Sequence, residues 1–150
     1  MRVHLVHHGE AVDPGVDLRR PLSPRGRAEA EAVAAALAAR GAKPDVVWHS
    51  GKLRAKQTAE LCWAACAPFA TFEATRDTQP DDPASWMRDR LRYEPREVLI
   101  AGHFTHLPRL LAALLGGDHA AFPQHGAVTL ETNDEGATWQ ELWRVERGAR

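Results

Sequence analysis

The chain has few cysteines, no long apolar run and almost no net charge. Its 150 residues include two cysteines, and 19 Lys and Arg nearly balance 20 Asp and Glu, for a formal net charge of −1. Such a chain has no global field to attract nucleic acid or an anionic membrane. No apolar run approaches the roughly 20 residues that span a bilayer. We therefore expect no nucleic acid and no membrane as partners, and any attraction for an anion must be local.

The two cysteines, Cys62 and Cys66, are four residues apart in a helical pattern. A redox pair would more naturally be Cys-x-x-Cys, and a zinc site would need two more ligands nearby. We expect both cysteines to be reduced packing residues. The chain enters a strand pattern directly at Val3, with no charged leader or cleavage site, so we do not expect secretion by a signal peptide. These observations favour a cytoplasmic location.

Strand and helix patterns alternate along the chain, which is typical of an α/β fold. Short apolar runs predict the strands, and helical periodicity between capping residues predicts the helices. Strands are predicted at 2–7, 45–49, 69–72 and 97–101, helices at 24–40, 53–66, 86–93 and 105–115, and a hairpin at 127–132 and 140–145. Ser23 and Gly41 are the expected caps of the first helix, and Thr105 is the expected N-cap of the last.

The length and composition suit one compact unit. With 44% hydrophobic residues, 150 residues suffice to bury a core. We expect a single domain over residues 1–150. The order of its elements favours a three-layer α/β/α sandwich with a mostly parallel central sheet.

One arrangement occurs twice, an apolar run that ends in histidine. His8 follows the first predicted strand, and His103 follows the strand at 97–101. The carboxyl ends of neighbouring strands in an open α/β sheet face one crevice, where ligands bind. Arg54 opens the helix at a third strand–turn–helix junction, and helix N-termini favour anions. Each side chain alone is more often an ordinary polar residue, but together they predict a phosphate site.

Four motifs resemble those of the histidine phosphatase superfamily. They are HGEA at 8–11, RPLSxxG at 20–26, SxxxRAxQTAE at 50–60 and GH at 102–103. The sequence is most similar to the short bacterial branch of that family, the SixA-type phosphohistidine phosphatases. The similarity runs from the first strand to the final hairpin, and it implies a phosphoglycerate mutase-like fold.

The resemblance also implies a two-step phosphoryl transfer. His8 would be the nucleophile, phosphorylated transiently and then freed by water, with its other nitrogen held by a hydrogen bond, in our expectation to a backbone carbonyl. Arg54 and His103 would be catalytic and would hold the phosphoryl oxygens, with Gly9 part of the phosphate-binding loop. The resemblance implies neither a metal nor a cofactor.

One position departs from the family pattern, which begins Arg-His-Gly. Here His7 stands where the family has an arginine that clamps the phosphoryl group. A hydrogen bond to a charged group contributes about 1.5–3 kcal/mol, so losing one clamp could slow transfer roughly 10- to 150-fold. Three outcomes are open. A protonated His7 replaces the clamp, with more activity at mildly acidic pH; Arg19 or Arg20 reaches in; or the site binds phosphate without turning it over.

The expected substrate is phosphohistidine on a protein partner. Larger members of the superfamily carry an insertion with a carboxylic acid that protonates an alcohol leaving group, and this chain has little room for one. Asp81 and Asp82 are candidate general acids, although a solvated turn is the better explanation of both. An imidazole leaves readily once protonated near its own pKa of about 6.5.

A small phosphate ester is the alternative substrate, which would make the chain a phosphomonoesterase or mutase relative. A catalytically weak phosphate-binding module is the other alternative.

A zinc cluster is the main alternative site. It can be drawn from His7, His8, His103, His106 and His125. Against it, no cysteine accompanies these histidines, and adjacent residues of a continuing strand point to opposite sides. Four histidines we interpret as ordinary strand, loop or surface residues: His4, His49, His119 and His125.

Overall fold

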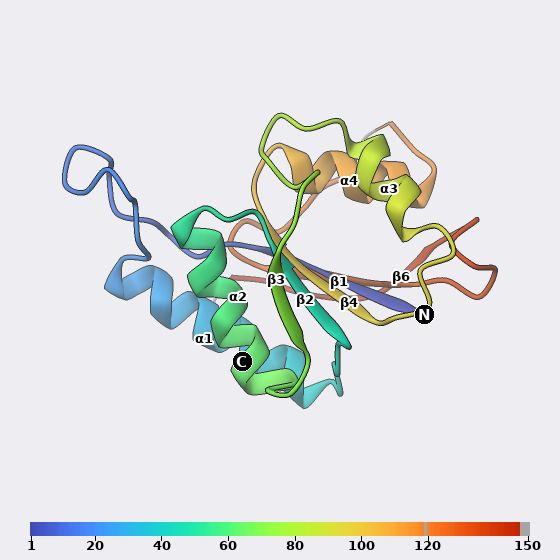
Figure 1. The fold of residues 1–150 in the computed structure, drawn as a ribbon, viewed down its shortest axis with the longest axis horizontal. Coiled ribbons are helices and arrows are strands. Elements are labelled where there is room, and N and C mark those ends of the chain that lie inside the picture. The colour runs from blue at the N-terminus through green and yellow to red at the C-terminus, as the bar shows by residue number, and fades with distance from the viewer. Residues whose placement is uncertain (119, 148–150) are drawn as a thin grey trace.

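The computed structural model describes residues 1–118 and 120–147, with a central sheet between two pairs of helices (Figure 1). The elements are β1 (Arg2–His7), α1 (Pro24–Ala39), β2 (Val46–His49), α2 (Leu53–Cys66), β3 (Thr71–Ala74), α3 (Ala84–Leu91), β4 (Val98–Gly102), α4 (His106–Leu115), β5 (Ala127–Glu131) and β6 (Gln140–Val145). No helix of the described residues is long and apolar enough to cross a membrane.

The sheet has the strand order β3-β2-β4-β1-β5-β6. The pairs β3–β2, β2–β4 and β4–β1 are parallel, whereas β1–β5 and β5–β6 are antiparallel. Helices α1 and α2 cover one face, and α3 and α4 cover the other (Figure 1). The predicted three-layer sandwich with a mostly parallel sheet and a final hairpin is confirmed.

Two apolar clusters, one on each face of the sheet, form the core. Alternate residues of β1 belong to opposite clusters, as the two-residue period of a strand requires. Leu5 packs in the cluster with α3 and α4, and Val6 packs in the cluster with α1 and α2. Cys62 is buried in the second cluster, and it and Cys66 are free thiols, as predicted. Burial raises the pKa of Cys66 to about 11, so the thiol stays protonated at neutral pH.

Two predicted elements are wrong by two residues at each end. The third strand covers Thr71–Ala74 instead of 69–72, because a turn closed by a 2.9 Å bond from Ala70 N–H to the Ala67 carbonyl comes first and leaves Phe69 fully exposed. Helix α3 covers Ala84–Leu91 instead of 86–93, because it begins directly after a proline and ends where the backbone of Arg92 becomes extended.

The expected helix caps hold in two of three cases. Ser23 caps α1 by accepting the Gly26 N–H at 3.0 Å. Gly41 follows α1 with φ of +83°, a conformation that favours glycine. Thr105 precedes α4 as predicted, but its side chain makes no capping bond.

The loop after β1 packs directly against the start of α1. Ser23 N–H donates to the Glu10 carbonyl at 3.0 Å. A Cβ on Gly26 would overlap that same carbonyl oxygen, and a Cβ on Gly9 would overlap the Gly26 carbonyl. Glycine at both positions lets the two backbones touch, which fixes the peptide after His8 against the helix.

We predict that Gly26→Ala lowers the free energy of unfolding by about 1–3 kcal/mol, the usual cost of an overpacked site. Alanine normally gains about 1 kcal/mol over glycine inside a helix, so the overlap must outweigh that gain. Urea denaturation measures the difference. The control is Gly15→Ala, in an exposed turn where an added Cβ meets the Asp13 carboxylate at 3.1 Å. Equal stability of the two variants would contradict the prediction.

Candidate active site

Parallel pairing brings the ends of β1 and β4 together. The register aligns His7 with Gly102, so His8 and His103 leave neighbouring strands side by side. The His8 N–H donates to the Gly102 carbonyl at 3.2 Å, and the ring centres of His8 and His103 are 5.1 Å apart. Burial first, and the charge of Arg54 among the further causes, lowers the pKa of both histidines. The three side chains singled out in the sequence thus lie in one cluster.

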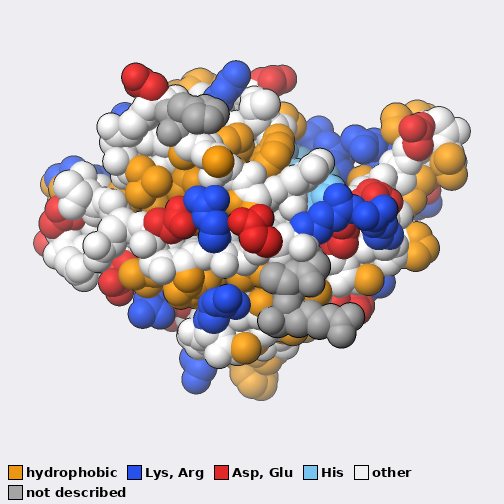
Figure 2. Space-filling model, turned by 180° about the vertical axis from the view of Figure 1, so that it is seen from behind, with side chains coloured by type: hydrophobic (Ala, Val, Ile, Leu, Met, Phe, Trp, Pro, Cys, Tyr) orange, Lys and Arg blue, Asp and Glu red, His pale blue; other side chains and the backbone are white. Residues whose placement is uncertain are grey.

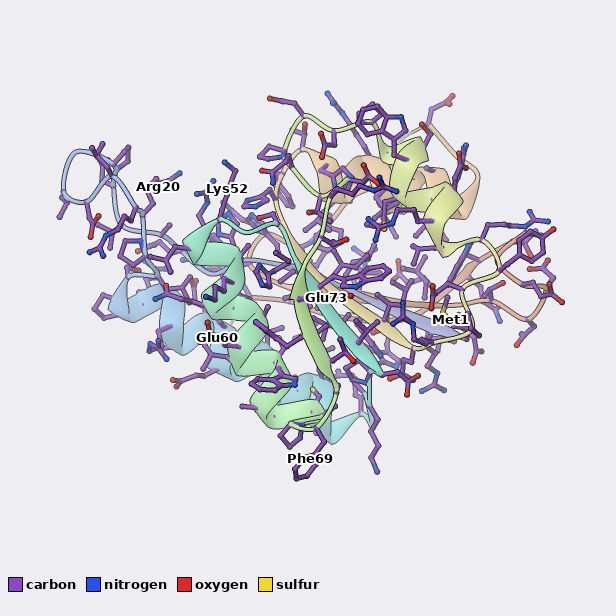
Figure 3. The ribbon with its side chains drawn as sticks, viewed as in Figure 1. Met1, Arg20, Lys52, Glu60, Phe69 and Glu73 are labelled. Carbon is purple, nitrogen blue, oxygen red and sulfur yellow. The ribbon has the colours of Figure 1, made fainter. Side chains whose placement is uncertain are left out.

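Basic side chains border this cluster. Arg20, in the loop after β1, and Lys52, just before α2, lie at the same end of the molecule (Figure 3). After burial, the charge of Arg20 contributes to the lowered pKa of Arg54, and the charge of Lys52 to that of His103. Figure 2 shows histidine at the surface in a hollow bordered by Lys and Arg side chains. This local positive charge on a near-neutral chain suits an anionic ligand.

The His8 ring is fixed in one tautomer. Its Nδ1 lies 2.6 Å from the Gly9 carbonyl oxygen, in agreement with the bond predicted from the sequence. A carbonyl only accepts, so Nδ1 carries the proton and Nε2 holds the lone pair. Burial lowers the pKa of His8 to about 4, although the Gly9 bond opposes the shift. The Gly9 N–H is itself held by Thr58 Oγ1 at 3.1 Å. His8 therefore presents a neutral nitrogen able to attack an electrophile.

Two buried N–H donors of the cluster lack an acceptor. His103 Nε2 lies 2.6 Å from Ser50 Oγ, and this hydroxyl accepts the Lys52 N–H. When the hydroxyl donates to Nε2, the proton of the neutral ring sits on Nδ1. Within residues 1–118 and 120–147, neither His103 Nδ1 nor Arg54 Nε has a hydrogen-bond partner. Buried polar groups rarely lack a hydrogen-bond partner. An oxyanion bound here would accept a hydrogen bond from each of the two nitrogens.

His7 lies between two rings. Its ring centre is 4.2 Å from that of Phe104 and 4.8 Å from that of His125, and both contacts are stacked. The His125 N–H donates to His7 Nδ1 at 2.7 Å, so the neutral ring keeps its proton on Nε2. Burial, followed by the charge of His8 and other nearby groups, lowers the pKa of His7 to about 2. The structure therefore argues against a protonated His7 as the replacement clamp.

The two arginines considered as replacements differ in position. Residues 11–22, here called the arm, project from the body (Figure 1) and are closed at their base by a bridge between Ala11 and Leu22. On the arm, Arg19 pairs with Asp17 at 3.1 Å and is largely exposed. Arg20 donates from Nε to the Val12 carbonyl at 3.1 Å, and its charge contributes to the lowered pKa of His8, after burial. Arg20 is therefore the one that borders the cluster.

The candidate general acids lie in the loop before α3. Asp82 accepts the Gln79 N–H at 2.9 Å, whereas Asp81 is exposed. The Gln79 side chain donates to the Ser50 carbonyl at 2.8 Å, which ties this loop to the β2–α2 junction. A catalytic role for either aspartate stays a prediction.

His125 also lies in the cluster, a position that its interpretation as an ordinary residue did not predict. Its Nδ1–H donates to the His8 carbonyl at 2.7 Å. It lies two residues before β5, and β5 runs antiparallel to β1. The start of β5 therefore meets the end of β1. Assigning the predicted hairpin to the first strand would have revealed this neighbour.

Of the other histidines interpreted as ordinary, His4 is buried and bonded within the sheet region. Its Nδ1 lies 2.7 Å from Thr129 Oγ1, and its Nε2 lies 3.0 Å from a Glu97 carboxylate oxygen. His49 accepts the Gly51 N–H at 3.0 Å. Both interpretations agree with these contacts, whereas His119 lies outside the described residues.

The zinc alternative is partly reproduced. One ring nitrogen each of His7, His8 and His125 lies within 4.8 Å of the others. The expectation that His7 and His8 point to opposite sides is wrong, because β1 ends at His7 and the two ring centres are 4.5 Å apart. In the tautomers set by the backbone, however, His7 Nε2 bears a proton, so the trio offers two lone pairs instead of three. In these tautomers the trio lacks the third ligand atom that a zinc site needs.

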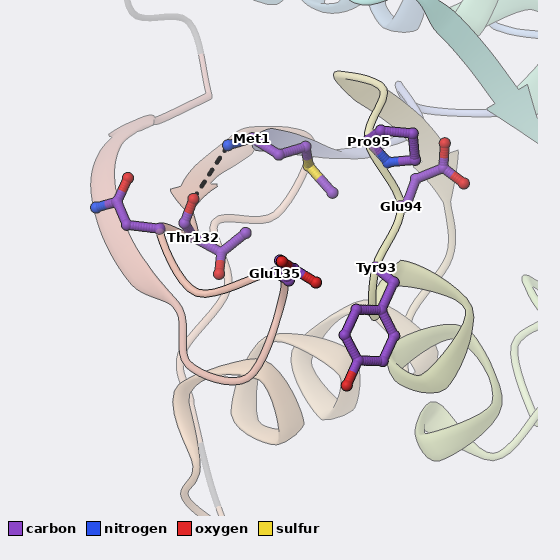
Figure 4. Close-up of a pocket in the computed structure, with 7 residues that line it drawn as sticks. Met1, Tyr93, Glu94, Pro95, Thr132 and Glu135 are labelled. Carbon is purple, nitrogen blue, oxygen red and sulfur yellow. Dashed lines mark hydrogen bonds between the residues drawn. The ribbon is translucent and has the colours of Figure 1, made fainter.

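A pocket of about 530 Å³ lies at the opposite end of the strands. It is lined by Met1, Tyr93, Glu94, Pro95, Thr132, Asn133 and Glu135. Figure 4 shows the Met1 amine bonded to the Thr132 carbonyl, at 3.0 Å. The length of β1 separates this pocket from His8, so it is distinct from the histidine cluster.

The buried histidines make stability depend on pH. The pKa values of His7, His8 and His103 lie at about 2, 4 and 3, whereas unfolded histidine titrates near about 6.5. Between these values the unfolded chain binds more protons. We predict that the free energy of unfolding falls between pH 7 and pH 5, by up to about 1.4 kcal/mol per pH unit for each histidine.

Urea denaturation in phosphate-free buffer measures this slope. His106 is buried, its pKa is lowered by burial, and neither ring nitrogen has a partner among the described residues. His106→Leu should reduce the slope of the free energy of unfolding against pH by the contribution of one histidine. A stability that stays constant over this pH range would contradict the prediction.

Comparison with known proteins agrees with this geometry. Residues 3–79 match the model of the histidine phosphatase superfamily (branch 1). No curated protein matches the chain.

Several solved structures share the fold. The protein histidine phosphatase SixA in complex with tungstate is 22% identical, with a TM-score of 0.82 and 97% of each chain covered. SixA from Agrobacterium tumefaciens is 24% identical, with a TM-score of 0.78 and 96% of each chain covered. A mycobacterial glucosyl-3-phosphoglycerate phosphatase is 19% identical, with a TM-score of 0.68 and 95% of this chain and 98% of that chain covered. With the family model matching more than half of its length, the chain belongs to the histidine phosphatase superfamily.

Proposed function

We propose that residues 1–150 form a single phosphatase domain that works through a phosphohistidine intermediate on His8, with phosphohistidine on a protein partner as substrate. The observation that carries the proposal is the 2.6 Å bond that leaves the lone pair on His8 Nε2, next to buried nitrogens of Arg54 and His103 that have no partner in the described part of the chain. A fixed nucleophile beside free N–H groups is what phosphoryl transfer requires.

In the first step, His8 Nε2 attacks phosphorus. A P–N bond forms to His8 as the bond from phosphorus to the leaving group breaks, and the leaving group takes a proton from solvent. Negative charge on the phosphoryl oxygens is met by the Arg54 guanidinium and the His103 N–H. The bond from His8 Nδ1 to the Gly9 carbonyl stabilises the positive charge that develops on the ring.

In the second step, water attacks the same phosphorus. The P–N bond to His8 breaks, the electron pair returns to Nε2, and the proton of the water passes to solvent as phosphate leaves. Because His8 is neutral at neutral pH, each cycle ends with the nucleophile ready for the next substrate. Neither step calls for a metal or a cofactor.

The leaving group favours phosphohistidine over an alkyl ester. An alkoxide demands a strong proton donor, whereas imidazole needs only a proton near its own pKa of about 6.5. The carboxylate of Asp82 is engaged with the Gln79 N–H, and Asp81 is exposed. A substrate that needs little acid assistance suits this site.

The arm supports a protein partner. Val16 and Leu18 are 80% and 89% exposed near its tip. The arm begins three residues after the nucleophile and is closed by the bridge at its base. Two exposed apolar side chains beside a phosphate site would contact a protein surface, whereas a small ester would not extend to them.

We predict that His8→Ala lowers phosphatase activity at least about 1,000-fold, because the covalent intermediate is lost. The assay offers a phosphohistidine protein, an aryl phosphate and a sugar phosphate side by side. Wild-type protein quenched without acid should carry phosphate on His8.

Other results would contradict the proposal in distinct ways. Unchanged activity of His8→Ala would exclude His8 as the nucleophile. Rapid turnover of the sugar phosphate alone would favour a small-molecule phosphomonoesterase or mutase relative. Tight binding of phosphate without turnover of any substrate would favour a binding module.

We further predict that the double variant Val16→Ser, Leu18→Ser raises KM for the phosphohistidine protein about 5- to 20-fold and leaves KM for the aryl phosphate unchanged. The estimate follows from the apolar area that each side chain buries on binding. Phe69→Ser is the matched control, because Phe69 is fully exposed and lies far from Arg20 and the arm (Figure 3). An equal effect on both substrates would argue against a role of the arm in partner binding.

A further inference from the structure

The position before the nucleophile lacks the charge that the family places there. His7 Nδ1 accepts the His125 N–H at 2.7 Å, so the ring donates only from Nε2 and carries no charge. A neutral imidazole gives one hydrogen bond, whereas the arginine it replaces gives two charged ones. The phosphoryl group therefore lacks about one positive charge on this side.

His125 has the open nitrogen that His7 lacks. Its Nδ1–H is committed to the His8 carbonyl at 2.7 Å, so Nε2 is the nitrogen left to act. One ring nitrogen of His125 lies within 4.8 Å of a ring nitrogen of His8 and of His7. A phosphoryl group on His8 extends over a similar distance, so its oxygens fall within reach of this ring.

Backbone contacts hold His125 in place. Gly126, the next residue, accepts the His7 N–H at 2.9 Å and donates to the Pro123 carbonyl at 3.0 Å. A Cβ on Gly126 would overlap the Val145 carbonyl. The segment is therefore packed against both β1 and β6, and the His125 ring is only 8% exposed. A ring held in this way is preorganised for its ligand.

We propose that His125 is a second phosphoryl-binding catalytic residue, which donates from a protonated Nε2 to an oxygen of the phosphoryl group on His8 and so replaces the missing arginine together with His7. The inference rests on the proposed function. His7 supplies a neutral hydrogen bond, and His125 supplies the charge. The protonation that the sequence suggested for His7 is thereby assigned to its neighbour.

This division of roles makes phosphate binding depend on pH. Outside the trio, the ionisable groups whose charge acts on His7 or His8 are His103 after β4, Arg54 on α2 and Arg20 in the arm. These groups are all bases, so in our proposal the bound phosphoryl group is the anion that shares a proton with His125. Both kcat/KM and the affinity for inorganic phosphate should therefore increase as the pH falls toward about 5.

Two substitutions separate the charge of His125 from its positioning role. In His125→Asn, the side-chain amide can still donate to the His8 carbonyl but cannot reach the phosphoryl group. In His125→Gln, the longer amide can reach the position of Nε2 but carries no charge. We predict that both lower kcat/KM for an aryl phosphate about 10- to 100-fold at pH 5.5 and much less at pH 8.

A rescue variant completes the test. The double variant His7→Arg, His125→Ser restores the family's arginine and removes the ring that stacks on it. We expect its activity to exceed that of His125→Asn and to vary little between pH 5.5 and pH 8. Recovery of wild-type rate and pH profile by His125→Asn would overturn the proposal, because His125 would then act only through its bond to His8.

Calorimetric titration with inorganic phosphate separates this inference from the proposed function. The affinity of His125→Gln should be about 10-fold or more below that of the wild type at pH 5.5. Equal affinities at both pH values would overturn the role of His125. Wild-type protein that binds phosphate but turns over no phosphorylated substrate would contradict the proposed function, while the affinity series would still decide whether His125 binds phosphate.

Discussion

The parallel alignment of β1 with β4 is the constraint on which the site depends. It places His7 opposite Gly102 and sets His8 and His103 next to each other. A slip of one residue would turn each side chain of the strand to the opposite face. The apolar residues on both faces of β1 prevent such a slip, since Leu5 and Val6 fill different halves of the core. Packing of the core thereby fixes the geometry of the polar cluster.

The main chain then decides what each imidazole can do. A carbonyl faces Nδ1 of His8 and of His125, whereas an amide N–H faces Nδ1 of His7. Three chemically identical side chains thus differ in the free, neutral site: Nε2 of His8 and of His125 carries a lone pair, and Nε2 of His7 carries a proton. The lone pair of His125 is the one that takes up a proton in our proposal when the phosphoryl group binds. Because the partners belong to the backbone, these roles persist through side-chain substitutions elsewhere in the molecule.

The sequence predicted most of the fold and the centre of the site, because strand periodicity, caps and motifs are local signals. It placed β1, β2, α2 and the hairpin within about one residue, and it identified His8, Arg54 and His103. It failed where a tertiary contact decides. His125 enters the site only because β5 pairs with β1, and the tautomer of His7 depends on an amide 118 residues away. The shift of β3 reflects the turn at 67–70, because Pro68 marks not only the end of α2 but also a turn that delays the strand to Thr71.

The contact between Gly9 and Gly26 has a consequence for how the molecule can vary. The arm lies between these two glycines, and both of its ends are anchored where the backbones touch. Because both ends are held, a change in conformation at the tip of the arm does not move the backbone of His8. The tip of the arm can therefore differ in length and surface without displacing His8, whereas Arg20, near the base, belongs to the surroundings of the site.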